Sequence, residues 1–80
     1  MTFSIFWEPA ATNTAAGFLV DDPGGLHRLI TALDDLATDP QPPGSSALGS
    51  PDQRRIRVGR YRAIYEISES QIVIVVVGRT

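Results

Sequence analysis

An alternation of side-chain types over residues 54–67 constrains the fold of this chain more than any other feature. The segment reads Arg-Arg-Ile-Arg-Val-Gly-Arg-Tyr-Arg-Ala-Ile-Tyr-Glu-Ile and holds five of the seven basic residues. Successive side chains of a strand point to opposite faces, so Arg55 and Arg57 share one face, and Ile56 and Val58 share the other. With a turn near Gly59, the pattern predicts a β-hairpin that is apolar on one face and basic on the other.

The clearest helix lies upstream of this hairpin. Asp22-Pro23 is a typical helix start, with aspartate as the N-cap and proline in the first helical position. Apolar residues then recur at helical spacing and form one stripe: Leu26, Leu29, Ile30, Leu33, Leu36 and Ala37. Pro40 ends the helix, because the residue before a proline avoids the α region. A weaker helix is predicted over residues 10–20, which contain four alanines.

Strands are predicted at both ends of the chain. Residues 3–7 (Phe-Ser-Ile-Phe-Trp) are aromatic and apolar on both faces, which favours a central position in a sheet. Residues 53–58, 60–67 and 71–77 form three further strands, the last of them continuously apolar and therefore interior. Residues 39–52 are rich in proline, glycine and serine and are predicted to form a loop.

The element order is strand, helix, helix, strand, strand, strand, which predicts an α+β fold. We expect residues 1–80 to form one domain, in which two N-terminal helices pack on one face of a four-stranded, mainly antiparallel sheet. The opposite face would then carry the arginines.

Composition restricts the classes of function. The chain has no cysteine and one histidine, so disulfides and thiolate or histidine metal sites are not expected. No apolar run is long enough to span a membrane and no signal peptide is visible, which predicts a cytoplasmic protein. Net charge is −2, but residues 1–50 carry −5 and residues 51–80 carry +3. This uneven distribution indicates a basic surface on the C-terminal half.

The chain resembles the RelE-type branch of the RelE/ParE toxin superfamily over about residues 3–79. The resemblance rests on the strand at 3–7 followed by Glu-Pro-Ala, on residues 33–40 (Leu-Asp-Asp-Leu-Ala-Thr-Asp-Pro), and on residues 55–67 after the loop. It implies the toxin of a type II toxin–antitoxin system, with a cognate antitoxin as partner. RelE-type members enter the ribosomal A site and cut mRNA there without a metal or small-molecule cofactor. The 2′-hydroxyl attacks the adjacent phosphodiester and leaves a cyclic phosphate.

The resemblance also implies roles for individual residues. Arg55 and Arg57 match basic residues that grip the RNA backbone and help to activate the attacking hydroxyl. Arg62 matches the arginine that neutralises the scissile phosphate, and Arg79 matches a basic position at the far edge of the site. A guanidinium group suits this chemistry because it stays protonated and binds two phosphate oxygens at once.

Arg54 and Arg60 are the remaining basic residues of the segment and are predicted to add peripheral RNA contacts.

Other readings of the same residues remain open. The arginines could form a solvated strand face paired with Asp52, Glu66 or Glu69. The tyrosines at 61 and 65 fit core packing better than base stacking. As a whole, the chain could also be a ParE-like inhibitor of DNA gyrase, a degenerate toxin that only binds its antitoxin, or an interaction domain without toxic activity.

Overall fold

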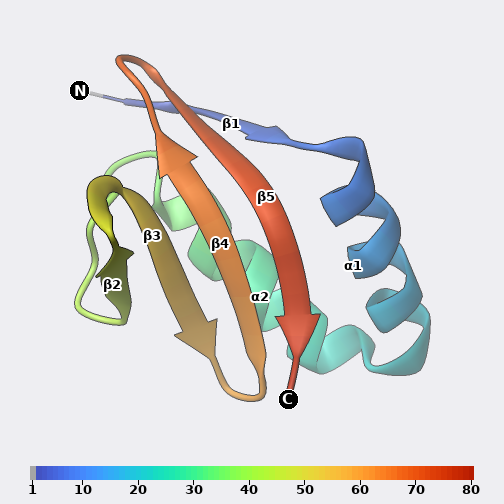
Figure 1. The fold of residues 1–80 in the computed structure, drawn as a ribbon. Coiled ribbons are helices and arrows are strands. Elements are labelled where there is room, and N and C mark those ends of the chain that lie inside the picture. Colours follow the sequence, from blue (N-terminus) through green and yellow to red (C-terminus); the bar gives the residue numbers. More distant parts are fainter. Residues whose placement is uncertain (1) are drawn as a thin grey trace.

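The computed structural model describes residues 2–80. The chain forms two helices and five strands, in the order β1 (Ser4–Trp7), α1 (Pro9–Asp21), α2 (Pro23–Asp35), β2 (Ser45–Leu48), β3 (Ser50–Val58), β4 (Tyr61–Ile67) and β5 (Gln71–Arg79). All five strands belong to one sheet with the order β1-β5-β4-β3-β2; in Figure 1, α2 lies behind this sheet and α1 lies to the right of β5. The predicted α+β class and helix–sheet layering are confirmed.

The sheet has five strands where the sequence predicted four. The additional strand, β2, lies in the segment predicted as a loop and pairs antiparallel with β3. A tight turn at Gly49, whose φ is +78°, joins the two strands. Serine and alanine have weak strand propensity, so the pairing of β2 depends on the neighbouring strand and left no local signal.

Strand β1 lies at an edge of the sheet, and the prediction of a central position was wrong. It pairs in parallel with β5 only, from Ser4 opposite Gln71 to Trp7 opposite Ile74. Phe6 is half exposed on this strand. Strand β5 is interior, as predicted, because β1 flanks it on one side and β4 on the other.

Helices α1 and α2 begin where the sequence predicted them, but α2 ends at Asp35, ahead of the predicted end at Pro40, because the next three backbone N–H groups form turn bonds to the third preceding residue. Pro9 and Pro23 occupy the first positions, and the side chain of Asp22 accepts a hydrogen bond from the Gly25 backbone N–H at 3.1 Å. The stripe of α2 faces the sheet, with Leu29 and Leu33 fully buried. Neither helix is long and apolar enough to cross a membrane within residues 2–80.

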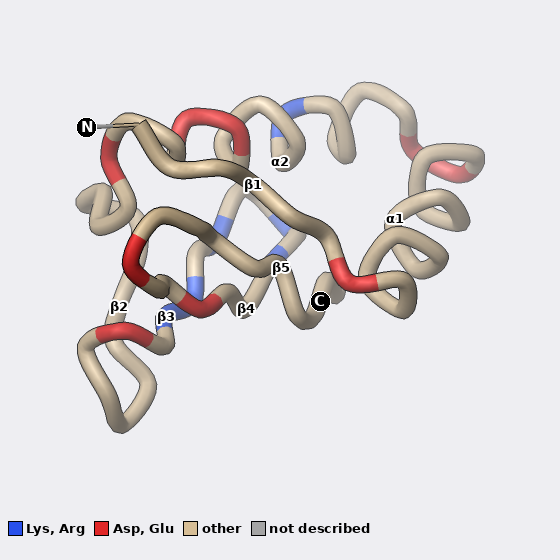
Figure 2. The backbone as a smooth tube through the Cα atoms, turned by 90° about the horizontal axis from the view of Figure 1, so that it is seen from above, with Lys and Arg blue, Asp and Glu red and all other residues tan. Residues whose placement is uncertain are grey.

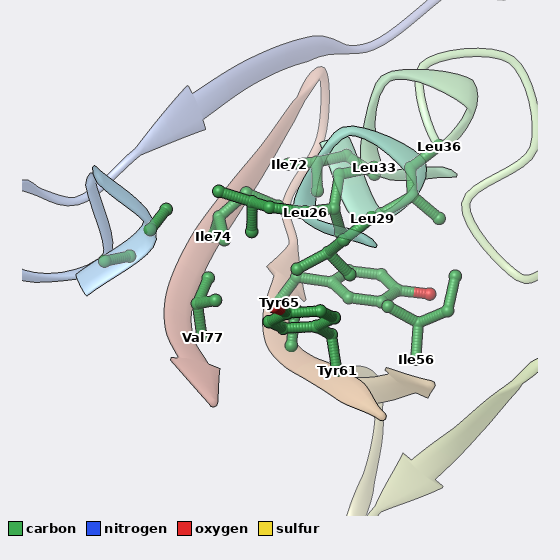
Figure 3. Packing of buried hydrophobic residues seen from close by; sticks show 13 residues of the cluster. Leu26, Leu29, Leu33, Leu36, Ile56, Tyr61, Tyr65, Ile72, Ile74 and Val77 are labelled. Carbon is green, nitrogen blue, oxygen red and sulfur yellow. The ribbon is translucent and has the colours of Figure 1, made fainter. Parts of the chain in front are cut away.

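The core lies between the helices and the sheet (Figure 3). The side chains of Tyr61 and Tyr65 are buried in it, as predicted, and each hydroxyl donates a hydrogen bond. The Tyr61 hydroxyl reaches Oδ2 of Asp22 at 2.9 Å, and the Tyr65 hydroxyl reaches the Pro40 carbonyl at 2.7 Å. These bonds connect β4 to the start of α2 and to the loop that follows it.

Candidate functional site

The sheet face turned away from the helices, here called the open face, carries the candidate site. Tyr61, Ala63 and Tyr65 of β4 point into the core, so the alternating Arg62, Ile64 and Glu66 lie on the open face. Strand pairing extends these positions sideways. Arg57 lies opposite Arg62, Arg55 opposite Ile64 and Gln53 opposite Glu66 on β3.

Three arginines line one hollow on this face. The hollow, here called the arginine pocket, has a volume of about 190 Å³ and is lined by Gly44, Ser46, Arg55, Arg57, Arg62 and Thr80. Arg57 and Arg62 are directly opposite residues of an antiparallel pair, and the side chains of such residues lie on the same face about 5 Å apart at Cβ. Figure 2 shows the basic positions of β3 and β4 on adjacent strands.

The pocket carries positive charge without a matching carboxylate. Among residues 2–80, one ion pair lies within 4 Å, and it joins Arg79 to Asp21. The alternative reading, in which Arg55, Arg57 or Arg62 pairs with a neighbouring acid, is therefore not what the structure shows. Like charges placed directly opposite one another destabilise a sheet. A bound anion would remove this repulsion.

Arg79 does not reach the arginine pocket, contrary to its predicted place at the edge of the site. Strand β5 extends to residue 79, where Arg79 lies opposite Tyr61 and therefore faces the helices. Its guanidinium group donates a hydrogen bond to Asp21 at 2.5 Å and lies 4.8 Å from the centre of the Phe18 ring. The hydrogen bond to Asp21 raises the pKa of Arg79. The residue thus links the end of β5 to the end of α1.

Arg54 and Arg60 also lie outside the pocket. Arg54 alternates with Arg55 and so belongs to the other face, where its guanidinium group donates to the Ser45 hydroxyl at 3.0 and 3.1 Å. Arg60 sits in the turn between β3 and β4 and lines a different hollow with Asp22 and Arg28. The predicted RNA contacts of these two residues would require other surfaces than the arginine pocket.

Sequence reasoning missed Ser46, Thr80 and Gly44, which complete the wall of the pocket. Ser46 lies opposite Arg55 because β2 pairs with β3. Since β2 itself was not predicted, the sequence contained no signal for this hydroxyl. The Ser46 hydroxyl can donate to an anion in the pocket, whereas the Thr80 hydroxyl donates to the Arg60 carbonyl at 3.3 Å.

Asp22 joins the helical layer to the hairpin that presents the pocket. This carboxylate accepts hydrogen bonds from the Gly25 backbone N–H and from the Tyr61 hydroxyl. The two bonds lower the pKa of Asp22, and the bond from Gly25 has the larger effect. The turn after β3 is further tied to the chain end, because the Thr80 N–H donates to the Arg60 carbonyl at 2.8 Å. The position of the pocket is thus fixed by buried packing and by these bonds.

The chemistry of the pocket suits a phosphate group. Planar guanidinium groups bind phosphate oxygens in pairs, and the Ser46 hydroxyl adds a further donor. No group of three histidine, aspartate or glutamate side chains in residues 2–80 is placed to hold a metal ion. His27, the single histidine, lies exposed on α2 behind the sheet.

Comparison with known proteins agrees with this fold. Residues 25–80 match the family described as the ParE toxin of the type II toxin–antitoxin system parDE. A search of the curated proteins finds no significant match.

Several solved structures share the fold at low sequence identity. The archaeal RelE–RelB complex from Pyrococcus horikoshii OT3 has a TM-score of 0.83 at 22% identity, covering 99% of this chain and 96% of that chain. The toxin–antitoxin complex RelBE2 from Mycobacterium tuberculosis has a TM-score of 0.81 at 20% identity, with 100% of both chains covered. The chromosomal ParDE system from P. aeruginosa has a TM-score of 0.78 at 12% identity, covering 99% of this chain and 97% of that chain. From the family match and the shared fold, we conclude that this chain belongs to the ParE toxin family, within the RelE/ParE toxin superfamily.

Proposed function

We propose that this toxin is a ribosome-dependent, metal-independent endoribonuclease that cuts mRNA in the A site and so inhibits translation in the cytoplasm. The observation that carries the proposal is the arginine pocket, in which Arg55, Arg57 and Arg62 meet without a carboxylate partner in the described chain. Such a pocket suits the backbone of RNA, since phosphate contacts supply most of the affinity for nucleic acids.

The proposed roles are those that the resemblance to RelE-type toxins implies for the three pocket arginines. Arg62 lies between Arg57 of β3 and Gly78 of β5, and it neutralises charge that develops on the scissile phosphate. Arg55 and Arg57 hold the RNA backbone and help to activate the 2′-hydroxyl for in-line attack. The attack breaks the bond to the 5′-oxygen of the next nucleotide and leaves a 2′,3′-cyclic phosphate.

We propose a different role for Arg79 from that of the three pocket arginines. Its bonds to α1 make it a structural contact between helix and sheet. In the proposed reaction it does not touch the RNA.

A translation assay tests the proposal. Purified ribosomes with a defined mRNA in the A site are incubated with the wild-type toxin, and new transcript ends are mapped by primer extension. We expect cleavage within the A-site codon, and Arg62→Ala should slow it about 10²–10³-fold, the usual loss when a charge-stabilising donor is removed. Arg28→Ala is the matched control, because Arg28 is an exposed arginine on α2 behind the sheet. Intact mRNA with folded wild-type protein would refute the nuclease proposal.

A second candidate function is inhibition of DNA gyrase. One observation favours it: the family that matches residues 25–80 is described as the ParE toxin. A supercoiling assay with purified gyrase separates the two functions. Loss of supercoiling together with intact mRNA in the ribosome assay would identify the gyrase inhibitor.

We further propose that a cognate antitoxin binds this toxin, as in the relatives solved as toxin–antitoxin complexes. An apolar groove of about 460 Å³ between the two helices could receive an amphipathic helix, and it is lined by Trp7, Thr12, Ala15, Ala16, Leu19, Leu26 and Ile30. Leu19 is 45% exposed, so Leu19→Lys should weaken antitoxin binding without unfolding the toxin. Co-purification with the protein encoded beside the toxin checks this.

A further inference from the structure

The open face carries opposite charges on either side of an apolar row. Arg62, Ile64 and Glu66 follow one another at every second position of β4, so a basic, an apolar and an acidic side chain lie in line. Val76 of β5 lies opposite Ile64 and is 47% exposed, which widens the apolar row. Ile64 is partly buried and Val76 is exposed, so the row presents apolar surface between the charged side chains.

The two charged groups cannot satisfy each other within one chain. Arg62 and Glu66 are four residues apart on a strand, which corresponds to about 13 Å. Neither has an ion-pair partner within 4 Å among residues 2–80. Glu66 lines a second hollow together with Asp52 and Gln53, where β3 begins and β4 ends, away from the arginine pocket.

We propose that the open faces of two copies of this chain associate as a symmetric dimer that covers both arginine pockets. A twofold axis running across the strands at the level of Ile64 reverses the direction of β4 in the second copy. It therefore places Arg62 against the partner's Glu66, and Glu66 against the partner's Arg62. Ile64 and Val76 each meet their own copy at the axis. The face is self-complementary at the Arg62 and Glu66 positions, as a closed dimer requires, while the same axis places Arg57 against the partner's Gln53.

Arg55 makes the proposal specific. It lies opposite Ile64 on β3, and therefore at the level of the axis, where the two Arg55 side chains would approach each other. The same charge thus has opposite effects at two neighbouring positions. Arg62 stabilises the dimer and Arg55 destabilises it, so the substitutions Arg62→Ala and Arg55→Ala form a matched pair with the same change in net charge.

The face is small, so the dimer is weak. The four strands β1, β5, β4 and β3 span about 15 Å at a spacing of about 4.8 Å. At about 3.3 Å per residue, the seven residues of β4 span about 23 Å, so the face covers about 350 Å². This area is below the roughly 800 Å² per partner of a standard stable interface, and we expect a Kd of about 10–100 µM. The toxin would be a free monomer at low concentration, and its arginine pocket would be covered as the concentration rises.

Sedimentation equilibrium of the purified toxin between 1 and 500 µM, in 50 mM and 500 mM salt, tests the dimer without RNA or ribosomes. The result is therefore independent of the proposed nuclease activity. We expect Arg62→Glu and Glu66→Arg each to weaken the dimer about tenfold or more, because each substitution places like charges together twice. The double substitution restores the attraction with the signs exchanged, and its Kd should return to within about threefold of the wild-type value.

Two further comparisons complete the test. Arg62→Ala should weaken the dimer while Arg55→Ala tightens it, each by about threefold. Val76→Lys should abolish it, and Val20→Lys should leave it unchanged, because Val20 is 88% exposed on α1 and lies outside the open face. Circular dichroism verifies that each variant is folded. A wild-type protein that stays monomeric at 500 µM, a double substitution that fails to restore dimerisation, or a dimer broken by Val20→Lys would overturn the proposal.

Discussion

Gly25 lies in the third position of α2, where the structure leaves no room for a side chain. An ideal Cβ built on Gly25 overlaps Oδ2 of Asp22 and comes within 2.9 Å of Cε2 of Tyr61. Both neighbours are held by the hydrogen bond between the Tyr61 hydroxyl and Asp22. The substitution Gly25→Ala would therefore push on the helix cap and on a buried ring at the same time.

Two effects oppose each other in this variant. Alanine is the better helix former and would favour the helix by up to about 1 kcal/mol. Overpacking of a filled site costs about 1–3 kcal/mol, and here the same movement also weakens the bonds that Asp22 accepts. The cost of overpacking should exceed the gain in helix propensity, because the Tyr61 ring is only 1% exposed and cannot move into solvent. We expect a net loss of about 1–2 kcal/mol, or a fall in Tm of about 4–16 °C for a domain of this size.

Chemical denaturation followed by circular dichroism measures this loss, and two other glycines provide controls. An ideal Cβ meets no atom within 4 Å at Gly24, the residue before Gly25, or at Gly17 in the middle of α1. Gly24→Ala should be neutral, and Gly17→Ala should stabilise the fold by about 0.5–1 kcal/mol. If Gly25→Ala were as stable as Gly17→Ala, the proposed steric conflict at the start of α2 would be refuted.

Three further changes should alter stability in ways that denaturation curves can check. Leu33→Ala removes a side chain with no exposed surface and should cost about 2–5 kcal/mol, whereas a cost below about 1 kcal/mol would contradict its place in the core. Tyr65→Phe leaves the Pro40 carbonyl without its donor and should cost about 1–2 kcal/mol. The pKa of Asp22 is lowered in the folded protein, so its ionised carboxylate stabilises the fold at any pH above its ordinary pKa of 3.8. This stabilisation is lost as the pH falls through the lower pKa of the folded state. Asp22→Asn should therefore reduce the loss of stability between pH 5 and pH 2, and an unchanged acid profile would argue against the role of this cap.

The helices and the central strands could be predicted because their signals are local. The stripe of α2 depends on the spacing of residues within one segment, and the start at Asp22-Pro23 depends on two adjacent residues. The alternation over residues 54–67 fixed which arginines share a face. Period-two geometry placed Arg55 and Arg57 on one face, the resemblance added Arg62 to the same site, and the arginine pocket contains all three.

The two edge strands show where local signals end. The apolar content of β1 indicated a central strand. Apolar side chains on a strand reflect what covers its faces, however, and not whether both of its edges are paired. Phe3 and Ile5 pack against the core cluster while Phe6 stays half exposed, and pairing with β5 alone is enough to hold the strand. Strand β2 exists because β3 is long enough to pair with it, which is a property of the assembled sheet.

Arg79 was misplaced for a reason that register explains. A strand that ends at residue 77, as predicted, leaves Arg79 free to turn toward either face. In the structure, β5 continues to residue 79, and the pairing of Arg79 with Tyr61 commits its side chain to the helical layer. The register along β5 contains a bulge at Val75, since Ile64 lies opposite Val76 and the next residue, Tyr65, lies opposite Ile74. One extra residue reverses which side chains of a strand face the core. The face on which Arg79 lies therefore depends on a bulge that has no recognisable signal in the sequence. For the arginines of β3 and β4 the alternation predicts the face correctly, because the pairing of these two strands has no bulge from Gln53 to Val58.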